Sequence, residues 1–366
     1  MVITLDKKEF ADAVQSVARF AQRTSASLPV LSGIAILAGD DGIKLRATNL
    51  ETGIDLSLKG TIKESGVVAL PANVLREITA SLSGTGPLTL EMAGSTVTVA
   101  SGTGKSVLKT LPYDDFPILP LPESPKATFA IPGAILRALI TSVASYASTS
   151  TVRPELASVL IAAEGGVLKA VATDSFRLAE KKIGLTGAVP PFSMLIPAKN
   201  ALDIVQTLPD TEVSVSLDDH QCVFTWEGGL MTTRLVAASY PDYVQIIPKS
   251  AVAEATILKK DFETALRRTA VFSDAFQKVR LAYDQGSKRI TLSAQNADVG
   301  ESSEVISGNL TGDPVELSFN HRYLSAPLSL IGSESVTLSA SGMGRAMILR
   351  GAGDASFLYL VMPMNQ

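Results

Sequence analysis

Three landmarks recur in the same order three times along the 366 residues of this chain. The first is a helical stretch in which Phe10, Leu136 and Phe262 hold the same place, each 126 residues from the next. The second is a polar turn between two alternating strands, "ATNLETGI", "ATDSFRLA" and "AQNADVGE", and the third runs "VALPANVLREITASL", "MLIPAKNALDIVQTL" and "VELSFNHRYLSAPLSLI". Such self-similarity indicates a repeated domain. We therefore predict three copies, at 1–125, 126–249 and 250–366, joined by the Pro-rich stretches "PILPLPESP" and "YPDYVQIIPKS".

Each copy is rich in short strands of alternating polarity. In the first copy these are "GIKLRAT", "GIDLSLKG", "PLTLEMA", "STVTVAS" and "SVLKTL", punctuated by Gly, Ser and Asp at hairpin spacing. Phe10, Val14, Val17 and Ala21 instead follow the spacing of one helix face. Six helical segments are expected, at 6–23, 72–82, 132–143, 197–208, 259–272 and 319–331. The sequence thus predicts an α+β fold of three repeated antiparallel-sheet domains, each with two helices.

The composition is that of a globular protein in a reducing compartment. With 46% hydrophobic residues the chain can bury a sizeable core, and its single Cys222 excludes an internal disulfide framework. The start "MVITLDKKEF" lacks the pattern of a signal peptide, and no apolar run reaches the roughly 18 residues that cross a bilayer. We therefore expect a cytoplasmic protein without a membrane segment.

The charge is unevenly distributed along the chain. A formal net charge of -4 ordinarily argues against a nucleic-acid partner. Yet the six helical segments hold 12 Lys and Arg against 7 Asp and Glu, a balance of +5 that leaves -9 for the remainder. The basic residues are Lys7, Lys8, Arg19, Arg23, Arg76, Arg137, Lys199, Lys259, Lys260, Arg267, Arg268 and Arg322. Two interpretations stay open: solvated helix faces, or, if all helices face one way, a basic lining that attracts a phosphate backbone without reading sequence.

The sequence contains no set of catalytic residues. "SGTGKS" at 101–106 has Val99 where a phosphate loop needs Gly, and it leads into a strand, so no helix N-terminus follows it. His220 and His321 are about 100 residues apart in different copies, which predicts neither a metal cluster nor a triad. Cys222, in the strand "QCVFTW", is expected to be a buried structural thiol. We expect no metal, no cofactor and no enzymatic activity.

The segment "AVATDSFRLAEKK" at 170–182 interrupts two strands with Thr173, Asp174 and Ser175. Asp and Ser favour tight turns, so a purely structural turn is one interpretation. Phe176 follows the polar residues directly, however, and the same frame recurs in the other copies, so a binding surface is the alternative. In the structural interpretation Phe176 packs into its own domain core, whereas in the functional one it contacts a partner.

As a whole, the chain resembles the bacterial DNA polymerase III beta subunits, the sliding clamps. The resemblance spans all three copies and rests on "LPVLSGIAI", "ATNLETGI", "TLPYDDFP", "ATDSFRLA", "YPDYVQIIP" and the terminal "YLVMPM". It implies a DNA-clamp fold: a ring of two head-to-tail chains, with helices lining the hole around duplex DNA. It also implies a processivity factor that tethers the polymerase III alpha subunit, the clamp loader, other polymerases and repair proteins through short linear peptides.

The resemblance further assigns three groups of residues. The peptide groove would comprise Leu156, Thr173, Ser175, Phe176, Arg177, Leu178, Pro241, Ile246, Asn320, Tyr323, Met343, Leu360, Met362, Pro363 and Met364. Leu178 and Met362 would form its floor, Phe176 and Met364 its walls, and Arg177 would meet a carbonyl or carboxylate of the peptide. The DNA backbone would contact Arg23, Arg76, Arg153 and Lys199. In the homodimer, Val107 and Leu108 would pair near Val271 and Phe272 of the partner subunit.

The sequence departs from the family pattern at three places. Ser175-Phe176 stands where most relatives have Gly-His, Asn365-Gln366 ends the chain where many have a basic residue, and Ser106 replaces a usual aromatic. The peptide preference of the groove therefore does not follow from the resemblance. From the residues alone, two other classes remain: an NTP-dependent enzyme using "SGTGKS", and a three-repeat β-rich adhesion or carbohydrate-binding protein.

Overall fold

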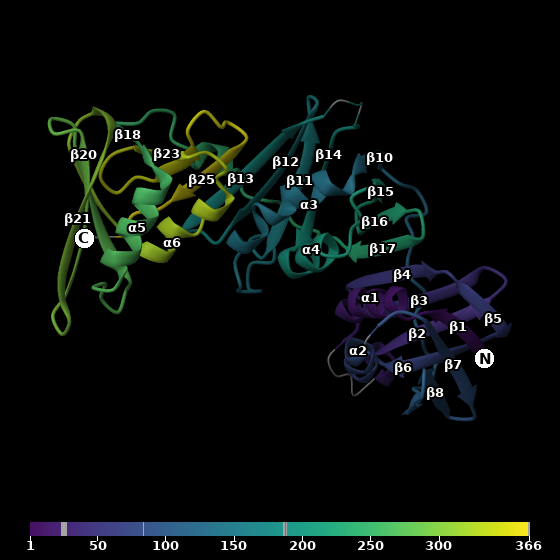
Figure 1. Cartoon of the computed structure of the whole chain (residues 1–366). Coiled ribbons are helices and arrows are strands. Elements are labelled where there is room, and N and C mark those ends of the chain that lie inside the picture. Colours follow the sequence, from purple (N-terminus) through teal and green to yellow (C-terminus); the bar gives the residue numbers. More distant parts are fainter. Residues whose placement is uncertain (23–27, 83, 186, 188, 365–366) are drawn as a thin grey trace. The chain divides into compact units, whose positions relative to one another are not determined.

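The computed structural model describes residues 1–22, 28–82, 84–185, 187 and 189–364. Its contacts divide the chain into two compact units. We call them the N-terminal unit (Met1–Ala138 with Val189–Ala237) and the C-terminal unit (Leu139–Ala188 with Ala238–Gln366). A similar order of strands and helices occurs three times along the chain (Figure 1). The predicted α+β fold of three repeated antiparallel-sheet copies is confirmed.

The first copy alternates two helices with short strands. Its elements are β1 (Val2–Asp6), α1 (Lys7–Val17), β2 (Gly33–Gly39), β3 (Gly42–Thr48), β4 (Thr52–Leu58), β5 (Gly60–Glu64), β6 (Gly66–Pro71), α2 (Ala72–Ser81), β7 (Pro87–Ala93), β8 (Thr96–Ser101) and β9 (Gly104–Lys109). Short 3-10 turns, η1 (Ala18–Phe20) and η2 (Pro29–Ser32), lie between α1 and β2.

The second and third copies repeat this order, except that a single strand, β13 or β21, follows the turn where the first copy has β4 and β5. The second contains β10 (Ala127–Pro132), α3 (Gly133–Thr141), η3 (Ala144–Tyr146), β11 (Ser158–Glu164), β12 (Val167–Thr173), β13 (Arg177–Gly184), β14 (Phe192–Pro197), α4 (Ala198–Val205), β15 (Glu212–Leu217), β16 (Gln221–Trp226), β17 (Gly229–Arg234) and η4 (Tyr243–Ile246). The third contains β18 (Ala253–Leu258), α5 (Lys259–Ala270), β19 (Lys278–Asp284), β20 (Arg289–Asn296), β21 (Gly300–Gly312), β22 (Val315–Asn320), α6 (His321–Ser325), η5 (Leu328–Leu330), β23 (Ser335–Ala340), β24 (Met347–Gly351) and β25 (Phe357–Val361).

All six helices are shorter than their predicted segments, and two of them are much shorter. The segment at 6–23 is helical only to Val17 and then tightens into η1, so Ala21 lies beyond the helix whose face it was predicted to share. The segment at 319–331 forms α6, which ends before Pro327. Proline has no N–H for a helix interior, which explains the break.

In the N-terminal unit, α1 and α2 pack side by side against the strands of the first copy. Asp6 begins α1 by accepting a hydrogen bond from the Lys8 N–H at 2.9 Å, and Phe10, Val14 and Val17 are buried on one face. The strands form a five-stranded sheet, β5-β1-β7-β8-β9, and an eight-stranded sheet, β10-β15-β16-β17-β4-β3-β2-β6. The strand β9 is therefore an edge strand of its sheet.

In the C-terminal unit the strands form one continuous ladder in the order β11-β12-β13-β25-β24-β23-β18-β21-β20-β19-β22. The helix α5 packs on β20 and β21 and also contacts α6. Phe262 and Leu266 are buried on the inner face of α5. No helix of the described ranges is long and apolar enough to cross a membrane.

The same joint between consecutive copies occurs once in each unit. In the N-terminal unit the last strand of the second copy, β17, pairs with β4, so that Thr232 faces Gly53. In the C-terminal unit the last strand of the third copy, β25, pairs with β13, so that Leu360 faces Leu178. Since Gly53 and Leu178 hold equivalent places in their copies, the two joints have the same register.

Candidate functional site: an apolar groove in the C-terminal unit

A polar turn between β12 and β13 forms one end of the site. The Asp174 carboxylate accepts hydrogen bonds from the N–H groups of Phe176 and Arg177, both at 3.0 Å. The Thr173 hydroxyl donates to the Arg177 carbonyl at 2.7 Å, and Ser175 has a φ of 78°, in the left-handed region. These side chains supply the hydrogen bonds of the turn. The Phe176 side chain is not packed in the core: it is 60% exposed.

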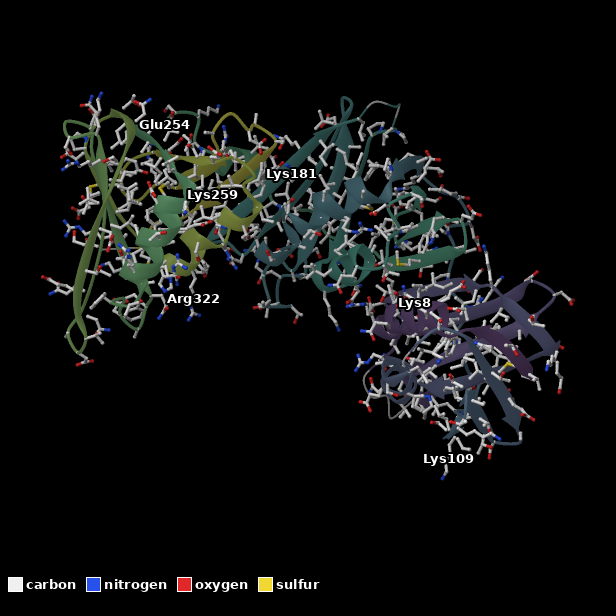
Figure 2. All side chains as sticks on the ribbon, viewed as in Figure 1. Lys8, Lys109, Lys181, Glu254, Lys259 and Arg322 are labelled. Carbon is white, nitrogen blue, oxygen red and sulfur yellow. The ribbon has the colours of Figure 1, made fainter. Side chains whose placement is uncertain are left out.

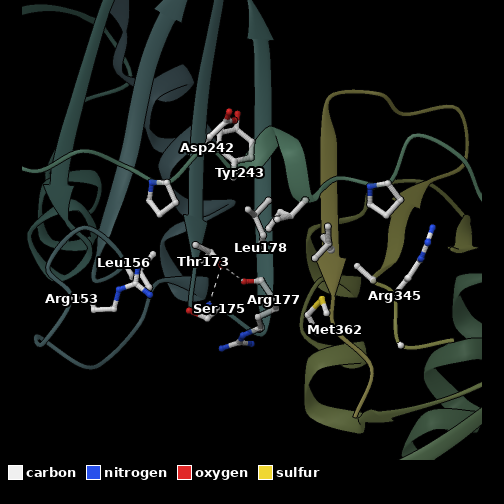
Figure 3. A pocket seen from close by; sticks show the side chains of 16 residues that line it. Arg153, Leu156, Thr173, Ser175, Arg177, Leu178, Asp242, Tyr243, Arg345 and Met362 are labelled. Carbon is white, nitrogen blue, oxygen red and sulfur yellow. Dashed lines mark hydrogen bonds between the residues drawn. The ribbon is translucent and has the colours of Figure 1, made fainter. Parts of the chain in front are cut away.

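Beside this turn lies the first hollow, with a volume of about 620 Å³ (Figure 3). Its floor is apolar, because Leu178 and Leu360, which face each other across the β13–β25 ladder, are both buried. The hollow is lined by Arg153, Leu156, Thr173, Ser175, Arg177, Leu178, Pro241, Asp242, Tyr243, Ile246, Pro248, Gly344, Arg345, Ala346, Leu360 and Met362. One wall is thus the segment 241–248, and another is the loop before β24.

A second hollow of about 520 Å³ adjoins the first and shares Ser175 and Met362 with it. It is lined by Ser175, Phe176, Asn320, Tyr323, Met362, Pro363 and Met364. We refer to the two hollows together as the groove. An exposed surface of Met, Leu, Pro and Phe side chains adapts well to apolar ligands, because methionine in particular is flexible and polarizable.

The structure brings nearly all of the predicted groove residues together. The exception is Met343, which is exposed beside the groove and lines neither hollow, although the adjacent Gly344 does. Sequence reasoning missed Asp242, Tyr243, Pro248, Gly344, Arg345 and Ala346. The stretch "YPDYVQIIP" was singled out in the sequence, so it already pointed to the first three of these.

Arg177 lines the first hollow, but its charge is already paired. Its Nε donates to the Asp174 carboxylate at 2.8 Å, and its guanidinium lies 4.6 Å from the Tyr323 ring centroid and 5.2 Å from that of Tyr146. Burial raises the pKa of Tyr146 to about 12, although the nearby Arg177 charge opposes the shift. Arg177 therefore fastens the turn to aromatic neighbours, and its contact with a carbonyl or carboxylate of a bound peptide stays a prediction.

The predicted DNA contacts fall in different places. Arg76 and Lys199 line a polar cleft of about 890 Å³ in the N-terminal unit, together with Arg19 and Asp203. Burial raises the pKa of Asp203, while Lys199 and Arg19 oppose that shift. Arg153 instead lines the groove and pairs through Nε with Glu155 at 3.0 Å. Arg23 lies outside the described residues.

Several other helix cations are engaged within the fold. Arg137 donates through Nε to the Val205 carbonyl at 3.0 Å and pairs with Asp210. The Lys259 Nζ donates to the Ile331 carbonyl at 2.6 Å. By contrast, Lys8 on α1 and Arg322 on α6 project from the ribbon (Figure 2). The basic balance of the helices therefore overstates the number of cations that face solvent.

The predicted dimer contacts differ in exposure. On the edge strand β9, Val107 is 67% exposed, whereas Leu108 is buried in its own domain. Val271 is also largely exposed, directly after α5. Only Val107 of the β9 pair therefore offers its side chain to a partner.

The segments that could have carried catalysis or bound a metal have structural roles in the fold. "SGTGKS" spans the end of β8, the turn at Gly102 and Thr103 and the start of β9, so it leads into a strand, as predicted. Cys222 is buried, and burial raises the pKa of its thiol far above the ordinary value. Within the described ranges, no three His, Cys, Asp or Glu side chains converge as a metal site.

Three tandem copies with the joint described above form the fold of the DNA sliding clamps, and comparison with known proteins agrees. The sequence matches the DNA polymerase III beta subunit descriptions for the N-terminal domain at 1–120, the central domain at 130–242 and the C-terminal domain at 244–365. The Beta sliding clamp of Synechococcus elongatus is 29% identical over 347 residues, which cover 92% of each chain.

Solved structures show the same likeness. The sliding clamp from Pseudomonas aeruginosa bound to griselimycin has a TM-score of 0.93 at 27% identity and covers 100% of both chains. The DNA polymerase III beta subunit from Thermotoga maritima has a TM-score of 0.94 at 20% identity, covers 100% of this chain and 99% of its own, and supports the fold.

The chain belongs to the DNA polymerase III beta subunit family, the beta sliding clamps. It is a non-catalytic processivity factor that encircles duplex DNA. The predicted family and function are confirmed, and the alternatives of an NTP-dependent enzyme and an adhesion or carbohydrate-binding protein are not favoured.

Proposed function

We propose that the groove binds short linear segments of the polymerase III alpha subunit, the clamp loader, other polymerases and repair proteins, and so tethers them to DNA. The observation that carries this proposal is the buried apolar floor of Leu178 and Leu360 beneath exposed apolar rims. Phe176 and Met362 supply those rims, and both are accessible. Since the clamp of Pseudomonas aeruginosa has been solved bound to griselimycin, we propose this compound as a ligand of the same groove.

The DNA-facing residues and the assembly are part of the same proposal. Arg76, Arg153 and Lys199 contact the DNA backbone, and Arg23 joins them from outside the described residues. The contacts are independent of sequence, because phosphate charge supplies the attraction. Two chains close head to tail through Val107 and Leu108 against Val271 and Phe272 of the partner subunit. We place this clamp in the cytoplasm, with domain limits at 1–125, 126–249 and 250–366.

Substitution of Phe176 by Ala tests the groove directly. Because Phe176 is 60% exposed, its removal leaves the melting temperature unchanged. As an aromatic anchor of a binding surface it contributes about 2 kcal/mol, so binding of the alpha subunit and of griselimycin weakens by about thirtyfold. Calorimetric titration and thermal melting on the same purified variant measure both quantities.

Val167→Ala is the matched control, since Val167 is an exposed apolar residue at the start of β12 in the same unit. It leaves both binding and melting unchanged. A lowered melting temperature of Phe176→Ala with wild-type binding would show that the turn is only structural.

A further inference from the structure

A buried hydrogen bond lies directly behind one wall of the groove. The Tyr243 hydroxyl, at the start of η4, donates to Glu180 Oε2 on β13 at 2.6 Å. The other oxygen, Glu180 Oε1, pairs with the Lys182 ammonium at 2.7 Å. Both Glu180 and Tyr243 are buried. Burial above all, and then the bond to Glu180, raises the pKa of Tyr243 far above its ordinary value, so its hydroxyl is protonated and donates.

Tyr243 belongs to the segment that forms this wall (Figure 3). The segment also contributes Pro241 and Ile246 to the hollow. Its backbone hydrogen bonds are local, from the Tyr243 N–H to Pro241 and from the Ile247 N–H to Val244. Side chains must therefore hold it against the sheet. The Tyr243–Glu180 bond does so, assisted by the Lys169 ammonium 5.9 Å from the Tyr243 ring centroid.

The first copy provides an internal comparison that lacks this bond. Phe116 stands there in the place of Tyr243 and has no hydroxyl. Asp55 stands in the place of Glu180, and its carboxylate pairs with Arg46 instead. In that copy Leu119 is buried against Gly53, whereas its counterpart Ile246 is 54% exposed. In the first copy, which lacks the hydroxyl–carboxylate bond, Leu119 of the same chain thus fills the space at the joint. In the second copy, which has the bond, the corresponding space is open.

We propose that Glu180 and Tyr243 are positioning residues that hold the 240–248 segment away from the Leu178 floor and thereby keep the groove open for its ligand. The inference rests on the proposed function of the groove. Neither residue needs to touch the ligand through its polar atoms, since the bond acts through the placement of Pro241 and Ile246.

Tyr243→Phe removes only the hydroxyl and is the first test. A buried side-chain hydrogen bond of this kind leads us to expect griselimycin binding about five- to tenfold weaker. Amide hydrogen exchange at 240–248 becomes faster, because the segment loses its tether. Tyr283→Phe is the matched control: it removes a buried hydroxyl of the same unit, one that donates to the Met347 sulfur at 3.3 Å.

Glu180 is tested by two substitutions. Glu180→Ala weakens griselimycin binding as much as Tyr243→Phe, and the double variant is no weaker than either, because both remove one interaction. Glu180→Gln retains an acceptor oxygen for the Tyr243 hydroxyl and recovers most of the affinity. If Glu180 and Tyr243 only stabilised the fold, these variants would lose melting temperature equally, and their affinities for griselimycin would not differ from one another.

The outcomes separate this inference from the proposed function. Wild-type binding and wild-type exchange in Tyr243→Phe would overturn the inference, and so would an equal loss of binding in Tyr283→Phe. If the wild-type clamp itself does not bind griselimycin and the alpha subunit does not bind either, the proposed function fails. Exchange at 240–248 would then still decide whether the bond holds the segment.

Discussion

At the scale of single residues, the turn that closes the groove follows from side-chain chemistry. Asp174 and Thr173 were predicted to make a turn, and they do so through the same hydrogen bonds that Asn49 and Thr48 make in the first copy. The exposure of Phe176 did not follow from the turn alone. Local polarity predicts where a chain reverses, whereas the burial of the next side chain depends on strands distant in sequence.

Ser175 carries strain that glycine would relieve. Its φ of 78° matches the 73° of Leu50, the equivalent residue of the first copy. A left-handed conformation costs a non-glycine residue about 1–2 kcal/mol, and the greater freedom of unfolded glycine offsets part of the gain. We expect Ser175→Gly to raise the free energy of unfolding by about 0.5–1 kcal/mol in urea titrations. Leu50→Gly is the matched control and should give a similar rise, while no rise in either would refute the strain.

At the scale of elements, periodicity predicted most helices and strands to within a few residues. It placed α5 at 259–272, and the helix spans Lys259–Ala270. What periodicity did not reveal is that equivalent segments of two copies pack differently. Leu119 covers Gly53 in one, and Ile246 remains exposed beside Leu178 in the other. A glycine floor leaves room for Leu119 that a leucine floor does not leave, and in the second joint the Tyr243–Glu180 bond also holds the neighbouring segment in place.

A double-mutant cycle at Gly53 and Leu119 measures this packing. A Cβ at Gly53 would lie 2.3 Å from Leu119 Cδ2, so Gly53→Ala destabilises by about 1–3 kcal/mol through overpacking. Leu119→Ala leaves a cavity and costs about 2–3 kcal/mol. In the double variant the new methyl group enters the vacated space, so urea unfolding should show a loss smaller than the sum. Simple additivity would mean that the two residues do not compete for one space. Griselimycin binding serves as the control and is unchanged in all three variants.

At the scale of the whole molecule, two strands lack the neighbour that their counterparts have in the other copies. Within the described residues, no strand of the same chain supplies it. Within each unit the last strand of one copy pairs with the preceding copy, as β17 does with β4 and β25 with β13. The equivalent strand of the third copy is β21, whose residues 300–307 pair with β20 alone. The remaining last strand is β9, an edge strand from which Lys109 projects (Figure 2). A chain with both ends of one joint open must close with copies of itself or polymerise.

The repeat therefore specifies how two clamps meet, and Val107→Asp tests it. By the register of the other joints, Val107 holds the place of Thr232, which faces Gly53. Glu301 pairs with Gln295 as Gly53 pairs with Thr48, so Val107 would face Glu301 of the partner subunit. An added carboxylate there meets like charge and loses the apolar contact of a side chain that is 67% exposed in the single chain. Light scattering at micromolar concentration should give twice the 38.4 kDa chain mass for the wild type and the single mass for the variant. Ile118→Asp, on an exposed residue away from β9, stays dimeric as the control.

Wild-type clamp loaded on circular DNA should remain bound until the DNA is linearised, and equal release from both forms would exclude a closed ring.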